Sequence, residues 1–330
     1  MSNENPYPPS DSIIEKIAEM AKKGNLYPPS GEDIRKRIAE RNDLSVDNVF
    51  LGNGSTELID IIIRTLVAPG DEVVIPTPTF GMYEARTRIN GGRPVLVPVA
   101  EDLYWDVEGI LEAIGERTKV VFLCSPNNPT GNVIKEDDLW TILEQGIPTV
   151  VDEAYYEWKT EPGSAASFIK THSNLIVVRT LSKAYGLAGF RVGYGLADRG
   201  LVRYFLQVKI PFNINLPAIA AALGALDHSS DFDRKCQSIR EERAYLSREL
   251  STIEGLRIFP SEGNFVLVDA SDTGFSSEQI VQTLLEEDRI FLRPMSFDKM
   301  RKGFFRVTVR THKENCLCIE ILRRFFSRTR

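Results

Sequence analysis

Short runs of valine, isoleucine and leucine alternate with helical patterns from about residue 48 to residue 196, and no other feature constrains the fold as strongly. The runs lie at 49–51, 72–75, 119–123, 148–151 and 174–178. Because they are apolar almost throughout, they predict strands that are buried on both faces. Strands that alternate with helices are typical of an α/β fold, in which a mostly parallel sheet lies between two layers of helices. We expect Pro76 to end the second strand.

The pattern changes after about residue 198. Helices are expected near 215–227, 231–252, 276–287 and 313–326, and short strands at 265–268 and 305–309. This order predicts a smaller α+β domain. We therefore expect three parts: an N-terminal segment at 1–30 that packs with the small domain or with a partner subunit, a large domain at 31–235, and a small C-terminal domain at 236–330.

Composition and charge narrow the class of protein. A length of 330 residues fits two domains, and the net charge of −6 argues against a dedicated nucleic-acid or anionic-membrane binder. Four cysteines without a Cys-x-x-Cys pair, and three scattered histidines, predict neither a disulfide scaffold nor a metal site. The first residues lack the basic start and apolar core of a signal peptide, and the longest apolar stretch, 217–226, is too short to span a bilayer. We expect a cytoplasmic enzyme.

Polar residues gather where the predicted strands end, and ligands of open α/β sheets bind at those ends. Residues 52–56 (Gly-Asn-Gly-Ser-Thr) lead into a helix expected at 55–66, whose free N–H groups suit a phosphate, although a plain serine cap is the alternative. The third glycine of a dinucleotide fingerprint is missing and no Gly-Lys-Ser/Thr follows, so neither a Rossmann site nor a P-loop is predicted. Asp152 ends an apolar strand, where a carboxylate usually faces solvent or caps a helix.

A lysine stands out just past the run at 174–178. Lys183 lies among small residues, with hydroxyls at Thr180 and Ser182 before it and Arg191 after it. A lone lysine is usually a solvated surface residue. A lysine held near an anion-binding arginine is, however, the arrangement that Schiff-base chemistry needs.

Seven segments together resemble a known family, the fold type I pyridoxal-phosphate (PLP) aminotransferases, and within it the histidinol-phosphate aminotransferase branch. In chain order they are 3–7, 52–57, 78–83, 125–131, 152–155, 180–193 and 305–309. The resemblance covers essentially the whole chain. It implies a PLP-dependent transaminase that exchanges an amino group, in a ping-pong reaction, between glutamate/2-oxoglutarate and histidinol phosphate/imidazole-acetol phosphate. It also implies a homodimer with shared active sites.

The resemblance assigns roles around the cofactor. Lys183 would attach to PLP as a Schiff base and then move the substrate α-proton, while Asp152 would hold the pyridine nitrogen protonated. Tyr155 and Asn128 would bind the phenolate oxygen, and Phe80 would stack on the ring. Lys183, Asp152 and Tyr155 are thus the implied catalytic residues.

The implied phosphate cradle combines residues from two segments of the large domain, 54–56 and 180–191. Its members are Gly54, Ser55, Thr56, Thr180, Ser182 and Arg191. Tyr27 matches a tyrosine that reaches the cofactor phosphate of the neighbouring subunit, and the alternative is a tyrosine packed on a proline-rich turn.

The implied substrate-binding residues are Asn5, Asn128, Arg293 and Arg306. Arg306 resembles the arginine whose guanidinium grips a substrate carboxylate, and Arg293 matches a second arginine for the phosphate; both could instead be strand-edge charges. Relatives usually carry an N-terminal arm before the segment that starts here at residue 3, and a small residue where Arg310 stands. An extra guanidinium at Arg310 either alters which substrate side chain is selected or points to solvent.

Other activities share this scaffold. The first alternative is an aminotransferase for aromatic or other phosphorylated or phosphonate amines. The second is a PLP decarboxylase of a phosphorylated amino acid. The third, a non-enzymatic PLP-binding module, is disfavoured because Lys183, Asp152 and Arg191 are all present and no DNA-binding segment is added. The expected partners are small amino and 2-oxo acids, with neither nucleic acid nor membrane.

Overall fold

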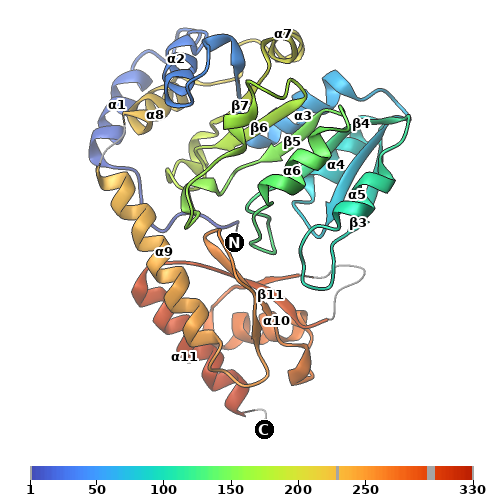
Figure 1. Ribbon diagram of the computed structural model, residues 1–330. Helices are drawn as coiled ribbons and strands as arrows, with labels where there is room; N and C mark the ends of the chain where they lie inside the picture. The colour runs from blue at the N-terminus through green and yellow to red at the C-terminus, as the bar shows by residue number, and fades with distance from the viewer. Residues whose placement is uncertain (1, 228–229, 296–301, 329–330) are drawn as a thin grey trace.

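The computed structural model describes residues 2–227, 230–295 and 302–328 (Figure 1). The strands of its larger part are β1 (Val49–Gly52), β2 (Glu72–Thr77), β3 (Arg93–Pro98), β4 (Thr118–Cys124), β5 (Thr149–Asp152), β6 (Leu175–Thr180) and β7 (Gly193–Ala197). The helices there are α1 (Asp11–Ala21), α2 (Glu32–Arg41), α3 (Ser55–Leu66), α4 (Met82–Ile89), α5 (Val107–Ala113), α6 (Glu136–Leu143), α7 (Arg199–Val208) and α8 (Leu216–Leu226). The smaller part contains α9 (Ser230–Leu250), β8 (Arg257–Ile258), β9 (Phe265–Asp269), α10 (Ser277–Asp288), β10 (Arg293–Pro294), β11 (Phe304–Thr308) and α11 (His312–Arg328).

The large sheet is mostly parallel, which confirms the predicted α/β fold. Its strand order is β1-β7-β6-β5-β4-β2-β3. Strands β6, β5, β4, β2 and β3 are parallel, whereas β7 runs antiparallel to β6 and β1 antiparallel to β7. The carboxyl ends of β4, β5 and β6 therefore meet at one edge of the sheet.

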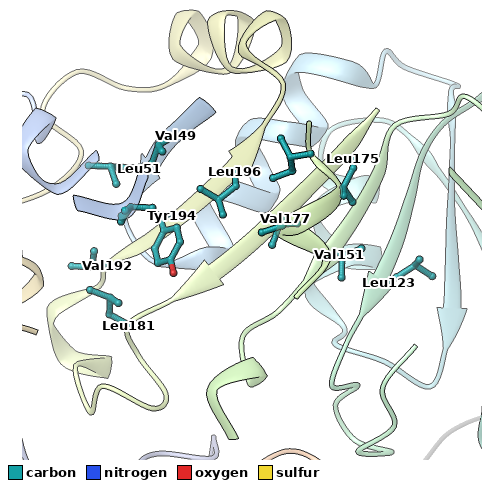
Figure 2. Packing of buried hydrophobic residues seen from close by; sticks show 14 of the residues in the cluster. Val49, Leu51, Leu123, Val151, Leu175, Val177, Leu181, Val192, Tyr194 and Leu196 are labelled. Atoms are coloured by element: carbon teal, nitrogen blue, oxygen red, sulfur yellow. The ribbon is translucent and has the colours of Figure 1, made fainter. Parts of the chain in front are cut away.

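Both faces of this sheet are buried, as the apolar runs predict. On β4, Val121 and Leu123 join one hydrophobic cluster, together with residues of α2, α6 and α8. Val120 and Phe122 point the other way and join a second cluster, with residues of α3 and α7. Figure 2 shows part of the first cluster along neighbouring strands. Alternate residues of each strand thus pack against the helices on opposite faces of the sheet.

Three details of the sheet differ from the sequence-based expectation. Strand β2 continues through Pro76, because its register with β4 ends at Val74 while only the β3 pairing goes on. Strand β3 was not expected, and it is an edge strand with prolines and exposed positions. Strand β7 was not expected either, because glycines weaken a strand pattern. A Cβ at Gly195 would lie 2.2 Å from the ring of Phe50, so the bare backbone is needed there.

The smaller part is a four-stranded antiparallel sheet, in the order β10-β11-β9-β8, packed against α9, α10 and α11. The helices expected at 215–227, 231–252, 276–287 and 313–326 are confirmed as α8, α9, α10 and α11. Figure 1 shows α9 running from the upper part of the molecule down to the lower part. Residues of α9 from Phe232 onward, among them Cys236 and Ile239, pack in the hydrophobic cluster of the smaller part. The domain boundary at residue 235 stays a proposal.

The N-terminal segment contacts both parts. Helix α1 packs on α8, where Gly224 faces Ile13, and thus covers the larger part rather than the small domain. Before α1, the chain lies between the two parts: the Tyr7 hydroxyl is 2.8 Å from that of Ser238 on α9. Among the described residues, no helix combines the length and the hydropathy that crossing a bilayer requires.

Candidate active site

A cavity of about 650 Å³ lies at the carboxyl ends of β4, β5 and β6, and residues of both parts of the chain line it. Twelve of the predicted site residues contribute to its wall: Ser55, Thr56, Phe80, Asn128, Asp152, Tyr155, Thr180, Ser182, Lys183, Arg191, Arg293 and Arg306. They come from segments between Ser55 and Arg306 that are far apart in sequence. Folding therefore brings most of the predicted site together.

Asp152 is the buried carboxylate of the cavity, and its side chain is fixed by two donors. The Tyr83 hydroxyl donates to Oδ2 at 2.8 Å, and the Ala154 N–H donates to Oδ1 at 3.0 Å. Burial raises the pKa of Asp152 to about 6, while the bond from Tyr83 and the charge of Lys183 act in the opposite direction. Tyr83 is itself fully buried and stacks on Phe122, with 4.8 Å between ring centroids.

Lys183 is held among positive charges. Burial, together with the guanidiniums of Arg306 and Arg191, lowers the pKa of its amine to about 8, against the opposing charges of Glu4 and Asp152. Its Nζ lies 5.6 Å from the ring centre of Tyr155 and donates to the carbonyl of Ser2. An amine with a pKa this low is partly unprotonated near neutral pH, so it can act as a nucleophile and as a base.

An anion cradle is formed where β1 turns into α3. Gly54 has φ +78°, and a Cβ there would lie 2.2 Å from Nη2 of Arg191, so glycine lets the guanidinium approach the turn. Nη1 of Arg191 donates to the Ser182 hydroxyl at 3.3 Å. Ser55 begins α3, whose free N–H groups add a positive end to the same place. A helix N-terminus, an arginine and hydroxyls together fit a phosphate.

Tyr155 lies on the side of the cavity that faces the smaller part. Its hydroxyl accepts from Nδ2 of Asn3 at 3.2 Å, and the Oδ1 of Asn3 accepts from the hydroxyl of Thr308 at 2.9 Å. Burial raises the pKa of Tyr155. The phenol therefore stays protonated and can donate a hydrogen bond into the cavity.

Two arginines of the small sheet face the cavity side by side. Arg293 on β10 is paired with Arg306 on β11, and residues directly opposite each other in an antiparallel pair share one face. Arg306 is buried, and its Nη1 donates to Oδ1 of Asn128. Burial lowers the pKa of Arg306, with a further contribution from the charge of Arg293. Two adjacent guanidiniums suit a carboxylate or a doubly charged phosphate.

Three of the predicted site residues lie outside the lining of the cavity: Gly54, Asn5 and Tyr27. Gly54 acts through the backbone turn described above. Asn5 instead donates through Nδ2 to the carbonyl of Ala184, 2.8 Å away, next to Lys183. Tyr27 is 80% exposed and stacks on Phe212 at 4.6 Å, so it does not reach the cavity of its own chain. Arg310, the departure from the family pattern, pairs with Glu314 at 2.9 Å and is also outside the lining.

Other lining residues were not predicted, among them Asn3, Thr79, Cys124 and Met295. Tyr83, which holds Asp152, was not predicted either. Asn3 and Tyr83 belong to the segments 3–7 and 78–83 that carried the resemblance, so the signal was present but only their neighbours were assigned roles. A hydrogen bond between residues 69 positions apart has no local sequence pattern.

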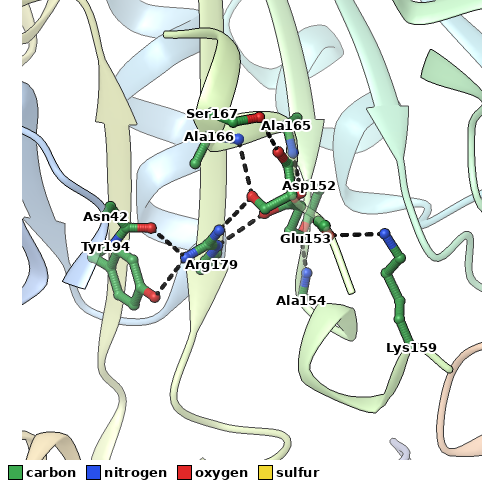
Figure 3. A network of polar contacts seen from close by, with 12 residues as sticks. Asn42, Asp152, Glu153, Ala154, Lys159, Ala165, Ala166, Ser167, Arg179 and Tyr194 are labelled. Atoms are coloured by element: carbon green, nitrogen blue, oxygen red, sulfur yellow. Dashed lines mark hydrogen bonds and ion pairs between the residues drawn. The ribbon is translucent and has the colours of Figure 1, made fainter. Parts of the chain in front are cut away.

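A buried ion pair supports the strand ends behind the cavity (Figure 3). Nε of Arg179 on β6 lies 2.9 Å from Oε2 of Glu153, the residue after Asp152. Nη1 of Arg179 also donates to Oδ1 of Asn42 at 2.9 Å, and Oε1 of Glu153 accepts from the N–H of Ala165 at 2.8 Å. Arg179 and Glu153 thus compensate each other's charge and also have further hydrogen-bond partners. Replacing either side chain would leave the other as an uncompensated buried charge.

Comparison with known proteins places this arrangement in a family. Residues 1–321 match the family described as aminotransferase class I and II. The histidinol-phosphate aminotransferase of Methanosarcina mazei is 37% identical over 318 residues, which cover 95% of this chain and 84% of that protein. That of Caldanaerobacter subterraneus subsp. tengcongensis is 38% identical, with 99% of this chain and 92% of that protein covered. The crystal structure of histidinol-phosphate aminotransferase from Sinorhizobium meliloti in complex with pyridoxal-5'-phosphate superposes with a TM-score of 0.90 at 28% identity, and covers 100% of this chain and 90% of that chain. The chain belongs to the class I and II aminotransferases.

Proposed function

We propose that this aminotransferase is PLP-dependent and exchanges an amino group between glutamate/2-oxoglutarate and histidinol phosphate/imidazole-acetol phosphate. The observation that carries the proposal is one cavity that contains a lysine of lowered pKa, a buried carboxylate and an anion cradle. The names of the relatives support the choice of the phosphorylated substrate.

The residues of the cavity fit PLP. The cradle around Ser55, Ser182 and Arg191 would hold its phosphate, and Asp152 would face its ring nitrogen. The remaining contacts would come from Phe80 on the ring face and from Tyr155 and Asn128 at the phenolate oxygen, with Lys183 as the point of covalent attachment. When bound, PLP supplies an electron sink for the bonds at the α-carbon of an amino substrate.

Each catalytic side chain then has a defined task. The Nζ of Lys183 takes the proton from the α-carbon of the amino substrate, for which its lowered pKa is suited. The ionised carboxylate of Asp152 holds the proton on the ring nitrogen, since it accepts but cannot donate in that form. The hydroxyl of Tyr155 stays protonated and donates a hydrogen bond.

We expect Arg306 and Arg293 to select substrates that carry a carboxylate or a phosphate. A glutamate carboxylate and a substrate phosphate both bind a guanidinium fork in two parallel hydrogen bonds. Arg306→Ala should therefore raise KM for glutamate and for histidinol phosphate together, by about tenfold to a hundredfold for a lost charged hydrogen bond. Arg310→Ala is the matched control, because its guanidinium pairs with Glu314 away from the cavity. Loss of one substrate alone would show that two separate groups bind them.

We also infer that the active unit is a homodimer in which Tyr27 reaches the phosphate cradle of the second copy. Tyr27 and Phe212 form an exposed stack, and Ile210, two residues before Phe212 in the chain, is 60% exposed. Large apolar side chains gathered at one place usually mark an interaction surface. A second copy that covers this surface would bring the Tyr27 hydroxyl to another chain.

The experiment that tests the reaction is a single-turnover assay. Purified protein is loaded with PLP and mixed with amino donors one at a time, and the absorbance change of the cofactor is followed. Histidinol phosphate and glutamate should both convert it, and borohydride treatment before mixing should fix the cofactor to Lys183, as mass spectrometry of peptides would show. Release of CO2 without consumption of a 2-oxo acid would identify a decarboxylase instead. An adduct on another lysine would refute the assignment of Lys183.

A further inference from the structure

A second group of chemically active side chains lies on the outer surface of the smaller part, away from the cavity. Cys316 and His312 are one turn apart on α11, and Glu242 and Tyr245 lie opposite them on α9. None of the four lines the cavity described above. Figure 1 shows α9 and α11 running beside each other in this region.

The geometry is that of a thiol, a base and a group that orients the base. The Sγ of Cys316 lies 3.5 Å from Nε2 of His312. The Nδ1 of His312 lies 3.0 Å from Oε1 of Glu242. A carboxylate can only accept, so this contact assigns the proton of the neutral imidazole to Nδ1 and leaves Nε2 as an acceptor toward the thiol.

Neighbouring groups hold this arrangement in place. The second oxygen of Glu242, Oε2, accepts from Nδ2 of Asn315 at 2.9 Å, so the carboxylate has a fixed orientation. The hydroxyl of Tyr245 lies 3.3 Å from Sγ of Cys316, and the proximity of Cys316 raises the pKa of this phenol. The phenol of Tyr245 therefore stays protonated and can donate a hydrogen bond to a thiolate at Cys316. Its ring also contacts the imidazole of His312, with 4.9 Å between centroids.

Cys316 differs from the other three cysteines, all of which are described. Cys124, Cys236 and Cys318 are buried, and burial raises the pKa of each thiol to about 12. Cys316 is half-buried, and the base beside it, His312, is 65% exposed. Of the four thiols, that of Cys316 is therefore the one that we expect a reagent to reach in the folded protein.

We propose that Cys316, His312 and Glu242 form a thiol-modification site at which Cys316 exchanges with small disulfides. The Nε2 of His312 takes the proton of the thiol. The sulfur of Cys316 attacks one sulfur of the disulfide, a new S–S bond forms, and the old S–S bond breaks. The leaving thiolate takes the proton back from Nε2. Cys316 is oxidised to a mixed disulfide, and the other half of the reagent leaves as a reduced thiol. This site is independent of the proposed transamination.

The test is the rate of reaction of the folded protein with 5,5′-dithiobis(2-nitrobenzoic acid), followed by the colour of the released thiolate. One thiol should react first, and Cys316→Ser should remove that phase. His312→Gln removes the base that takes the thiol proton, and it should slow the phase by about tenfold or more. Glu242→Gln should slow it less, since the imidazole remains. Cys318→Ser is the matched control on the same helix and should leave it unchanged.

Two further measurements separate chemistry from structure. In urea, His312→Gln and the unaltered protein should react at the same rate, because the pair exists only in the folded chain. With oxidised glutathione, the intact mass should rise by a single glutathionyl group, located at Cys316. An unchanged rate in folded His312→Gln, or a fast phase that survives Cys316→Ser, would overturn the proposal.

Discussion

Asp152 shows how a single side chain can oppose folding and still be needed. Burial raises its pKa from the ordinary 3.8 to about 6. Because this pKa is higher in the folded protein than in the unfolded chain, the folded state binds the proton more tightly. The free energy of unfolding of the cofactor-free protein should therefore fall as pH rises from about 4 to about 6.

Asp152→Asn removes this buried charge and keeps a side chain of the same shape. We expect the cofactor-free variant to be more stable than the unaltered protein at neutral pH by up to about 3 kcal/mol, at 1.36 kcal/mol for each pKa unit. At about pH 4 the gain should disappear, because the carboxyl is then protonated. Urea denaturation at the two pH values measures it, and transamination should be lost. If the variant and the unaltered protein were equally stable at both pH values, burial of the Asp152 carboxylate would not cost folding free energy.

Tyr83 is the side chain whose hydrogen bond helps to keep Asp152 ionised. Its hydroxyl lies 2.8 Å from Oδ2 and favours the charged carboxylate against the effect of burial. Tyr83→Phe should lower kcat by about tenfold or more, as for a lost hydrogen bond to a charged group, and leave KM nearly unchanged. The acid limb of the pH–rate profile should also move to higher pH, because the pKa of Asp152 rises when the donor is removed. A profile that keeps its position would assign Tyr83 a packing role only.

At the scale of elements, the turn between β1 and α3 determines whether the cradle can form. The free N–H groups of α3 are local in sequence, but the guanidinium of Arg191 can lie against Gly54, directly before α3, only because Gly54 has no side chain. Gly54→Ala should displace the guanidinium and weaken PLP binding by about tenfold or more, as for one charged hydrogen bond. Spectrophotometric titration of the cofactor-free protein with PLP measures the effect.

Gly70→Ala is the matched control for that experiment. Gly70 has φ +88°, close to the +78° of Gly54, but a Cβ there would meet nothing within 4 Å. An alanine at either position must adopt a positive φ and should cost about 1–3 kcal/mol of stability, at the upper end for Gly54, whose ψ of 167° lies in a region that is essentially restricted to glycine. Only Gly54→Ala should affect the cofactor. A similar loss of PLP affinity in both variants would show that backbone strain, and not the displaced arginine, is responsible.

At the scale of the whole molecule, the proposed dimer makes a prediction about mixed chains. Lys183→Ala removes the attachment lysine, and Tyr27→Ala removes a phosphate contact of about 1–3 kcal/mol. If Tyr27 acts in the partner's site, hybrids formed by refolding the two variants together contain one intact site and one doubly altered site. Their activity should exceed that of the separately refolded parents. If each tyrosine serves its own chain, every hybrid site carries one change and no activity is gained. A fully active monomer in sedimentation would contradict the shared site directly.

The sequence by itself determined the local parts of this protein. Apolar runs such as 119–123 and 174–178 indicated strands buried on both faces. Successive side chains of a strand point to opposite faces of the sheet, so a strand that is covered on both faces is apolar at every position. The periodic stretches at 215–227 and 313–326 indicated helices, and the polar residues at strand ends indicated where a ligand would bind. The family resemblance then named twelve side chains that the fold brings to one cavity.

Only the tertiary structure decided how distant side chains meet. The bond from Tyr83 to Asp152, the position of Asn3 between Tyr155 and Thr308, and the contacts of Glu242 and Tyr245 on α9 with His312 and Cys316 on α11 all join segments that no periodicity connects. Strand β7 depends in the same way on a distant ring, that of Phe50, which fills the space left by Gly195. Hydrophobic periodicity reports which face of an element is buried, because burial follows from the side chains of that element alone. Hydrogen bonds across the fold depend on the relative positions of two elements, and packing of the whole chain sets those positions.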